Sequence, residues 1–471
     1  MKKVVRFLSF ALVLVMAVSM FTACGTSEKE GQAGTPSQTV QTGASSQTGQ
    51  ASQQQSTGSD KKAEPVTLKI ASSSIEMQSS EFKKMEELCL ANGIKLDAIM
   101  MPPPKDGEAD KLLVSLMSGD EMDIMYQAYP NAKKFYDAGV ITPLEELTKG
   151  TDYNAEKVFG KYLPKFDGKV YGLPTFVDIW LTLYNKKIFD DAGVPYPKAE
   201  GWTWSKYVET AKKLTNTEKG IFGSFMANYN NYNYMYAVQC GASHYKQDGT
   251  SNYDDPFFAE GLKFYYDLGN VHKIQPDIVT QLGTKMTNDS FTTGKYGMFV
   301  CGGWTLSSLM ANKEKYPRDW KFGVLPMPYP DGQKKSTLTV IGCYFVPTTS
   351  KHKKEAFEAI KLLAEKRYTL GFGKVPCRVD LSNEELNNYI TNDLITAYKD
   401  DGVTVDDIRA AWFDPNMEVR DEKVIGYGST NINLTFVQEG QLYATGKQTL
   451  EETMKNIKAQ SDKAIQEAKV K

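Results

Sequence analysis

From residue 66 the chain alternates short strand-like segments with helix-like ones. Residues 66–72, VTLKIAS, alternate apolar and polar positions, and residues 94–100 and 123–126 form two further strand-like segments. Residues 81–90 and 108–118, which lie between them, are predicted to be helices. Strands that alternate with helices predict βαβ units and a parallel sheet, so we expect an α/β fold.

The ends of these strands are the first candidate contact regions. In parallel sheets, ligands bind beyond the carboxyl ends of the strands, which here means the loops at 73–80 and 127–131. Tyr126 ends the third predicted strand, and Gln127 and Tyr129 follow it. We predict that these three side chains contact a ligand; a surface polar residue or a core ring is the alternative for each.

A single carboxylate interrupts an apolar stretch in the middle of the chain. Asp178 lies between Val177 and Ile179, after Pro174, which is expected to end the preceding strand. A charge in such a stretch is costly unless it is paired or faces solvent in a cleft. Asp178 is therefore a candidate binding residue, and a buried carboxylate that caps backbone amides is the alternative.

A tryptophan follows two glycines at the end of another predicted strand. Residues 291–306, FTTGKYGMFVCGGWTL, run from a turn through an apolar strand to Gly302, Gly303 and Trp304. The glycines lack the side chains that would cover an indole, so Trp304 is predicted to present its ring to a ligand. A ring in the core of a lobe is the alternative.

Together these residue types suit a sugar. The C–H face of a pyranose packs on aromatic rings, and its hydroxyls bond to carboxylate and amide oxygens. The segment 227–234, ANYNNYNY, mixes both kinds of side chain. The site is therefore predicted to bind carbohydrate through Asp178, Trp304, Gly303 and, from this segment, Tyr229, Asn230 and Tyr232.

The beginning of the chain has the layout of a secretory signal. Lys2, Lys3 and Arg6 precede an apolar run over residues 7–21. This run is shorter than the about 20 residues that a stable membrane span needs. Removal of the signal would take the formal net charge from −2 to −5.

The run ends in FTAC, residues 21–24, which resembles the lipobox of bacterial lipoproteins. In a lipobox the chain is cut before the cysteine, whose thiol carries a diacylglycerol; Phe21 stands where leucine is usual. We predict that residues 1–23 are removed and that Cys24 is lipidated. A plain secretory signal with an incidental cysteine is the alternative.

The composition changes sharply along the chain. Residues 25–60 contain no aromatic residue and Val40 as their one large aliphatic residue. Such a segment cannot bury enough apolar surface to fold, so 24–63 is predicted to be a lipidated cysteine followed by a flexible tether. Residues 64–471 exceed one ordinary core and predict two lobes.

Charge and cysteine content exclude several classes of site. The 55 Lys and Arg nearly balance the 57 Asp and Glu, which argues against binding to nucleic acid. The cysteines after Cys24 form no CxxC pair, so we predict small buried side chains, with no metal site and no cofactor. They are Cys89, Cys240, Cys301, Cys343 and Cys377.

Five motifs in order carry a family resemblance. They resemble those of the family 1 extracellular solute-binding proteins, the substrate receptors of bacterial ABC importers, and the likeness covers essentially all of residues 65–471. The motifs are YGLP with LYNKKIFDDAGV, WTWSKYVETAKKL, FTTGKYGMFVCGGW, GVLPMPYPDG and CYFVPTTSKHKKEAFEAIKLL.

The resemblance implies a type II periplasmic-binding-protein fold, with two α/β lobes joined by a hinge that the chain crosses several times. The crossings are expected near 174–182 and 338–344. The implied lobes cover about 64–176 with 343–395, and about 177–342 with 396–471.

The resemblance also assigns roles in the site. In the maltose-binding relative, a carboxylate at the place of Asp178 contacts sugar hydroxyls, and a tryptophan at the place of Trp304 stacks on the sugar. Another stacking ring comes from the place of 227–234. Gln127 and Pro130 stand where that relative has a tryptophan and an acidic residue, so the sugar need not be a maltodextrin.

The expected function is that of a receptor, not an enzyme. A monomer held by its lipid on the extracytoplasmic face of the cell membrane, on a Gram-positive surface, would capture an oligosaccharide by hinge closure and pass it to ABC permease subunits. The alternatives are a lipid-anchored glycan-active enzyme and a glycan adhesin. S-x-x-K pairs occur at Ser80 with Lys83 and Ser350 with Lys353, without the companion K-T-G and S-D-N motifs.

Overall fold

The computed structural model describes residues 64–102, 108–310, 313–370 and 374–469. The predicted signal peptide, Cys24 and the tether lie outside these residues. The described residues form one compact unit.

A first sheet contains the strands predicted near the start of the folded part. β1 runs parallel to β2 and to β3, as the βαβ pattern predicts, and β10 joins β3 in antiparallel orientation. The first sheet comprises β1 (Val66–Ser73), β2 (Ile94–Met101), β3 (Ile124–Ala128), β10 (Ser336–Phe345), β11 (Val375–Pro376), β12 (Glu418–Asp421) and the first part of β6 (Gly172–Asn185).

The strand β6 belongs to two sheets. Ile179 pairs with Thr339 on β10, whereas the next residue, Trp180, pairs with Gly302 on β8. All 14 residues of β6 are buried, which explains its nearly continuous apolar sequence. The second sheet comprises the last part of β6 with β7 (Phe222–Phe225), β8 (Tyr296–Gly302) and β9 (Phe322–Pro326).

The prediction that Pro174 ends a strand is wrong. Pro174 lies inside β6 opposite Cys343, and the register of the ladder shifts between Gly342 and Cys343 on β10. A proline, which has no N–H to donate, is tolerated in a strand at such an irregularity. The apolar sequence therefore continues as one strand across the proline.

Other local signals are confirmed. Gly168, with a φ of 78°, lies in the turn between β4 (Lys165–Phe166) and β5 (Lys169–Val170). The helix α7 (Lys186–Ala192) ends at Gly193, which has the left-handed conformation that glycine adopts without steric cost.

Helices cover both sheets. Those that contact the first sheet or the β4–β5 hairpin include α1 (Ser74–Met77), α2 (Ser80–Ala91), α3 (Glu108–Met117), α4 (Tyr129–Asp137), α5 (Leu144–Leu147), α6 (Ala155–Phe159) and α12 (Lys353–Lys366). The segments predicted as helices over 81–90 and 108–118 correspond to α2 and α3.

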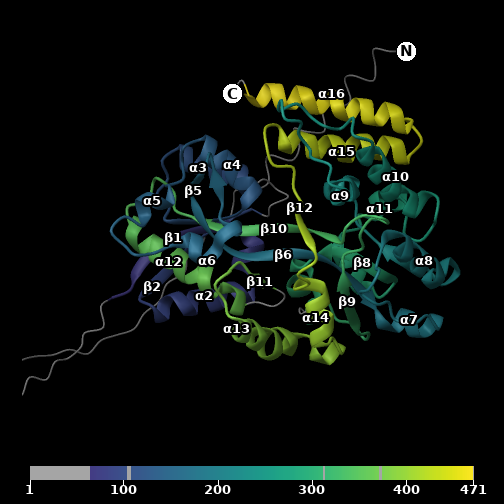
Figure 1. The fold of residues 1–471 in the computed structure, drawn as a ribbon, viewed down its shortest axis with the longest axis horizontal. Helices are drawn as coiled ribbons and strands as arrows, with labels where there is room; N and C mark the ends of the chain where they lie inside the picture. Colours follow the sequence, from purple (N-terminus) through teal and green to yellow (C-terminus); the bar gives the residue numbers. More distant parts are fainter. Residues whose placement is uncertain (1–63, 103–107, 311–312, 371–373, 470–471) are drawn as a thin grey trace, which may run out of the picture. The chain divides into compact units, whose positions relative to one another are not determined.

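Strands of the second sheet contact α7, α8 (Trp204–Leu214) and α14 (Val405–Trp412). The helices α15 and α16, drawn in yellow, pack along each other (Figure 1). The remaining helices are α9 (Met235–Gln239), α10 (Pro256–Asn270), α11 (Ile278–Gly283), α13 (Asn383–Asn388), α15 (Ser429–Ala444) and α16 (Leu450–Lys469).

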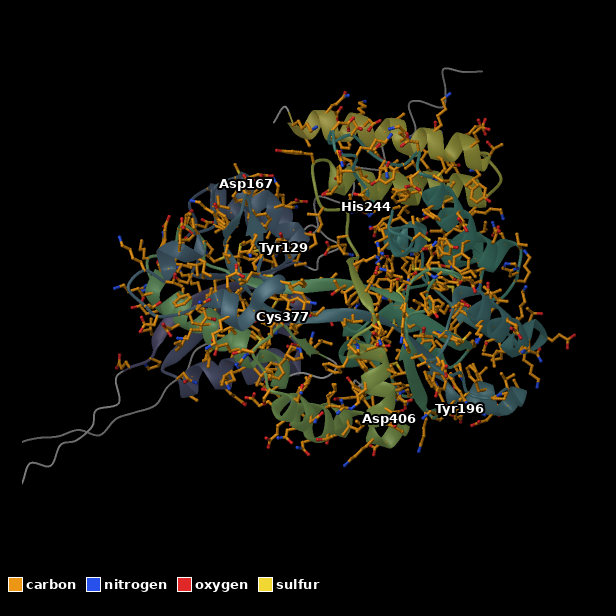
Figure 2. All side chains as sticks on the ribbon, in the orientation of Figure 1. Tyr129, Asp167, Tyr196, His244, Cys377 and Asp406 are labelled. Carbon is orange, nitrogen blue, oxygen red and sulfur yellow. The ribbon has the colours of Figure 1, made fainter. Side chains whose placement is uncertain are left out.

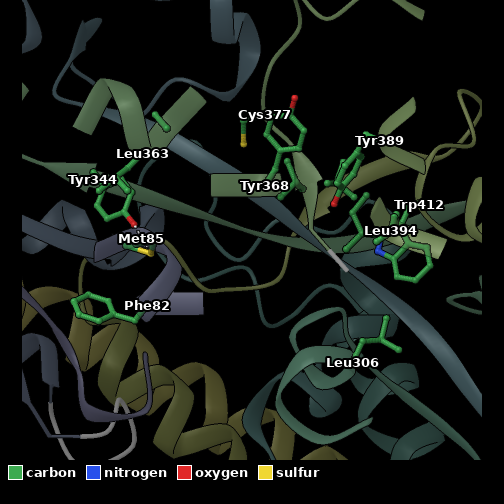
Figure 3. Close-up of a cluster of buried hydrophobic side chains, with 14 of the residues drawn as sticks. Phe82, Met85, Leu306, Tyr344, Leu363, Tyr368, Cys377, Tyr389, Leu394 and Trp412 are labelled. Atoms are coloured by element: carbon green, nitrogen blue, oxygen red, sulfur yellow. Dashed lines mark hydrogen bonds between the residues drawn. The ribbon is translucent and has the colours of Figure 1, made fainter. Parts of the chain in front are cut away.

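One apolar cluster includes side chains from both sheets, among them Leu68 of β1 and Phe299 of β8. Figure 3 shows part of it, where the Tyr344 hydroxyl donates a hydrogen bond of 3.6 Å to the Met85 sulfur. The five cysteines in this part of the chain are free, and all except Cys240 are buried as predicted.

No helix among the described residues has the length and apolar character needed to cross a membrane. Within the same residues, no group of three or more His, Cys, Asp and Glu side chains is placed to hold a metal ion.

Candidate ligand-binding site

Asp178 lies on β6 just before the strand passes from the first sheet to the second. Its side chain is buried, and in the described part of the chain its Oδ1 atom has no hydrogen-bond partner. Burial raises the pKa of Asp178 to about 6, while the nearby Lys374 ammonium acts in the opposite direction. Since Oδ1 accepts nothing there, the alternative of a carboxylate that caps backbone amides gains no support.

Lys374 is the nearest cation to this carboxylate. Its Nζ atom lies 3.8 Å from Asp178 Oδ2 and 4.0 Å from Glu81 Oε2, and it stands 3.7 Å from the centre of the Phe176 ring. The lysine side chain is 6% exposed. Both carboxylate distances exceed that of a direct N–H···O hydrogen bond, which is about 2.7–3.2 Å.

Arg367 completes the group of charges. It is fully buried, its Nε donates to Glu81 Oε1 at 2.8 Å, and one Nη donates to the Tyr344 hydroxyl at 2.9 Å. It also forms an ion pair with Glu76. Burial opposes ionisation of Glu81, yet the cations Lys374 and Arg367 hold its pKa below the ordinary value. Arg367 therefore already has its partners within the protein.

Trp304 follows β8 and is half-buried. Its indole lies over Gly302, where a Cβ atom would come within 2.0 Å of the ring atom Cζ3. The Trp304 and Trp180 ring centres are 5.9 Å apart at an interplanar angle of 83°. The Gly303 N–H donates to the Ile179 carbonyl at 3.0 Å, which ties this turn to β6 beside the carboxylate. Gly302 thus makes room for the indole itself.

A second buried carboxylate lies on the other side of the sheet change. Glu422 is 1% exposed and accepts the Trp180 indole N–H at 2.5 Å and the Asn231 amide at 3.3 Å. It also pairs with Lys423. Burial is the main cause of the raised pKa of Asp178, and the negative charge of Glu422 adds to it in the same direction.

The predicted contacts in 227–234 have different environments. Tyr229 is 40% exposed, and the Asn230 amide donates to the Asn433 side chain at 2.7 Å. Tyr232 is 2% exposed, and its hydroxyl donates to the Val300 carbonyl at 2.6 Å. Tyr232 therefore packs in the core of the second sheet, which leaves Tyr229 and Asn230 as the accessible side chains of this segment.

The three candidates at the end of β3 also have different environments. The ring centre of Tyr126 lies 4.5 Å from Arg367 Cζ, so Tyr126 contacts the same charged group. Gln127 is 2% exposed. The Tyr129 hydroxyl donates to the Lys165 carbonyl at 2.8 Å, and Figure 2 labels Tyr129 at the start of α4.

Lys374, Arg367 and Glu422 are absent from the residues predicted from the sequence. Glu422 lies in a polar segment that looks like a solvated loop, Arg367 directly follows the helix α12, and Lys374 stands between Gly373 and Val375; no periodicity marks these charges as buried. A depression of about 480 Å³ lies elsewhere in the molecule and is lined by residues between Leu144 and Val170.

Comparisons with known proteins identify the family of this chain. Residues 91–369 match the family described as bacterial extracellular solute-binding protein. The chain belongs to this family. Its members are receptors for solutes, which confirms the prediction of a binding protein rather than an enzyme. Ser350, from one S-x-x-K pair, donates to Asp123 at 2.7 Å and accepts the His352 N–H at 3.1 Å, which is a structural role.

Two relatives of this solute-binding protein have partial similarity. A protein of Brucella abortus, described as a binding protein, is 25% identical over 311 residues, which cover 63% of this chain and 71% of the relative. The arabinooligosaccharide-binding protein of Halalkalibacterium halodurans is 30% identical over 178 residues, which cover 36% of this chain and 38% of the relative.

Solved structures confirm the fold. The ABC substrate-binding protein of Listeria monocytogenes in complex with cycloalternan superposes with a TM-score of 0.69 at 21% identity, covering 86% of this chain and 100% of that chain. The solute-binding protein described here therefore has the predicted type II periplasmic-binding-protein fold with two α/β lobes.

Proposed function

We propose that this chain is the lipid-anchored receptor of an ABC importer and that it captures an oligosaccharide. The observation that carries the proposal is the arrangement at the sheet change in β6. There, the buried Asp178 carboxylate has an acceptor atom without a partner, and the Trp304 indole lies nearby over Gly302. The carboxylate can accept a hydrogen bond from a sugar hydroxyl, and the indole can pack against the apolar C–H face of the sugar ring.

The relatives support the same class of ligand. One is named for arabinooligosaccharides, and the Listeria monocytogenes structure holds cycloalternan. Both ligands are neutral and rich in hydroxyl groups. We therefore propose a neutral oligosaccharide, with Tyr229, Asn230 and Tyr126 as further contacts and Gln127, Tyr129 and Gly303 as residues that shape the site.

We propose that the ligand acts on a hinge. Because β6 changes sheets between Ile179 and Trp180, a rotation there moves residues of the two lobes relative to each other. A sugar that contacts both lobes would favour the closed form to the extent that it binds that form better. The burial of Asp178 and Lys374 fits a closed conformation. We also propose that the two lobes have the boundaries predicted from the sequence.

The anchor and the partner complete the proposal. A lipid on Cys24 and a tether over 24–63 would hold a monomeric receptor outside the cell membrane, where it meets the permease. The balanced charge of the chain fits a neutral ligand and gives no reason to expect nucleic acid as a partner.

Thermal unfolding with a panel of solutes tests the function. The mature chain from residue 24, with Cys24→Ser to keep it in solution, is heated with maltotriose, arabinotriose and N,N′-diacetylchitobiose, and separately with amino acids and organic anions. A neutral sugar at 100 times its Kd should stabilise the folded state by about 2.7 kcal/mol. Stabilisation by an amino acid or an anion alone would contradict the proposal.

A further inference from the structure

A buried carboxylate and a buried ammonium lie close together where β11 pairs with β6. Among the described residues Asp178 Oδ1 has no hydrogen-bond partner, and Lys374 Nζ is held by ion pairs with Asp178 Oδ2 at 3.8 Å and Glu81 Oε2 at 4.0 Å. The ammonium and the carboxylate are 3.8 Å apart, too far for a direct hydrogen bond. Buried polar groups in folded proteins are almost always bonded, so this pair calls for a third partner.

The chemistry of that partner follows from the pair. A carboxylate can only accept hydrogen bonds, and an ammonium can only donate them. A group that binds both at once must donate to Asp178 and accept from Lys374. A sugar hydroxyl does this, because it carries one O–H donor and two acceptor lone pairs.

The charges around the pair disfavour an ionised partner. The three carboxylates of Asp178, Glu81 and Glu76 form ion pairs with two cations, Lys374 and Arg367. An added ammonium would lie close to Lys374, and an added carboxylate would lie close to Asp178. At about 4 Å, like charges repel strongly in a protein interior.

Resting on the proposed function, we propose that Lys374 is a ligand-binding residue which, with Asp178, holds one neutral sugar hydroxyl and excludes sugars that carry an amine or a carboxylate at that position. The lysine is held in place for this role: its ammonium lies over the Phe176 ring, and its backbone carbonyl accepts a hydrogen bond from the Tyr389 hydroxyl at 2.6 Å.

Calorimetric titration of the mature chain compares neutral and charged probes. The neutral probes are maltotriose, arabinotriose and N,N′-diacetylchitobiose; chitobiose carries ammonium groups, and digalacturonate carries carboxylates. The variants are Lys374→Met and Asp178→Asn. The matched control is Lys351→Met, which removes an exposed lysine that pairs with Glu121 at 2.8 Å.

The wild type is expected to bind a neutral probe and neither charged probe. Lys374→Met should weaken binding of the neutral probe about 10- to 100-fold, the effect of a lost hydrogen bond to a charged group, and should admit chitobiose. Asp178→Asn should weaken the neutral probe and admit digalacturonate instead. Lys351→Met should match the wild type with all probes.

If Lys374→Met does not fold, Lys374→Arg serves in its place; it keeps the charge but moves the donors, so affinity should fall while chitobiose stays excluded. A folded Lys374→Met protein that binds neutral probes and excludes chitobiose as the wild type does overturns the role of Lys374 and leaves the proposed function intact. Absence of binding to every neutral probe by the wild type overturns the proposed function itself.

Discussion

The Trp304 indole occupies the space that a side chain at Gly302 would fill. A Cβ atom at Gly302 would lie 2.0 Å from Cζ3 and 2.1 Å from Cη2 of the ring. The indole can therefore occupy this position only if residue 302 is a glycine. Because Gly302 is the last residue of β8, the position of the ring also depends on how that strand ends.

Gly302→Ala should displace the Trp304 ring and weaken both folding and sugar binding. Overpacking of this kind costs about 1–3 kcal/mol of unfolding free energy. Gly283→Ala is the matched control, because a Cβ there meets no atom within 4 Å, and its stability should be unchanged or higher. Denaturant unfolding and titration calorimetry measure the two effects; equal behaviour of both variants would refute the dependence of the ring on Gly302.

Trp304→Ala should remove a stacking face and weaken sugar binding by several kcal/mol, whereas Trp304→Phe should retain part of the affinity because a smaller ring still offers a face. The change in tryptophan fluorescence when sugar is added should disappear in Trp304→Phe. Normal affinity in both variants, with a much lower melting temperature, would show that Trp304 serves only the core.

The stability of the protein should depend on the titration of Asp178. Its folded-state pKa of about 6 lies above the ordinary value of 3.8, so the folded protein keeps a proton that the unfolded chain releases between about pH 4 and pH 6. This residue therefore lowers stability as the pH rises through that window. The unfolding free energy of Asp178→Asn, relative to that of the wild type, should therefore rise by about 2–3 kcal/mol between pH 4 and pH 7.

Denaturant unfolding of the ligand-free proteins at several pH values checks this difference. A stability difference between wild type and Asp178→Asn that is independent of pH would show that Asp178 has an ordinary pKa. Asp97→Asn, which changes an exposed carboxylate, controls for charge removal in general.

Tyr232→Phe should affect folding and leave sugar affinity unchanged. The substitution removes the buried hydrogen bond to the Val300 carbonyl and should lower the unfolding free energy by about 1 kcal/mol, or somewhat more because an acceptor is left unpaired. Thermal unfolding and calorimetry of the same sample separate the two. Lost affinity with normal stability would place Tyr232 back among the ligand contacts.

Cys24→Ser should prevent lipidation and leave an uncleaved precursor or a protein released into the medium. Metabolic labelling with radioactive palmitate, followed by fractionation of the cells, measures this. Label that persists in the variant would place the lipid at another residue and refute the role of Cys24.

Much of the architecture could be predicted because it depends on neighbours in the chain. The alternation in 66–72 and 94–100 reproduces β1 and β2, and Gly193 ends its helix as its left-handed conformation requires. The same local logic failed at Pro174, because a proline inside a strand depends on a register shift in the partner strand. The order of the motifs identified the family, and the two-lobe fold was predicted from that family resemblance.

In the candidate site, too, some residues could be predicted from local sequence and others depend on contacts between distant parts of the chain. Asp178 and Trp304 could be singled out, since a charge in an apolar run and an indole after two glycines are visible in the sequence. The partners of the carboxylate could not: Lys374 reaches Asp178 only because β11 pairs with β6, and Arg367 reaches Glu81 from 286 residues away. Periodicity describes which face of a segment is buried, whereas the pairing of distant strands decides which charges meet there.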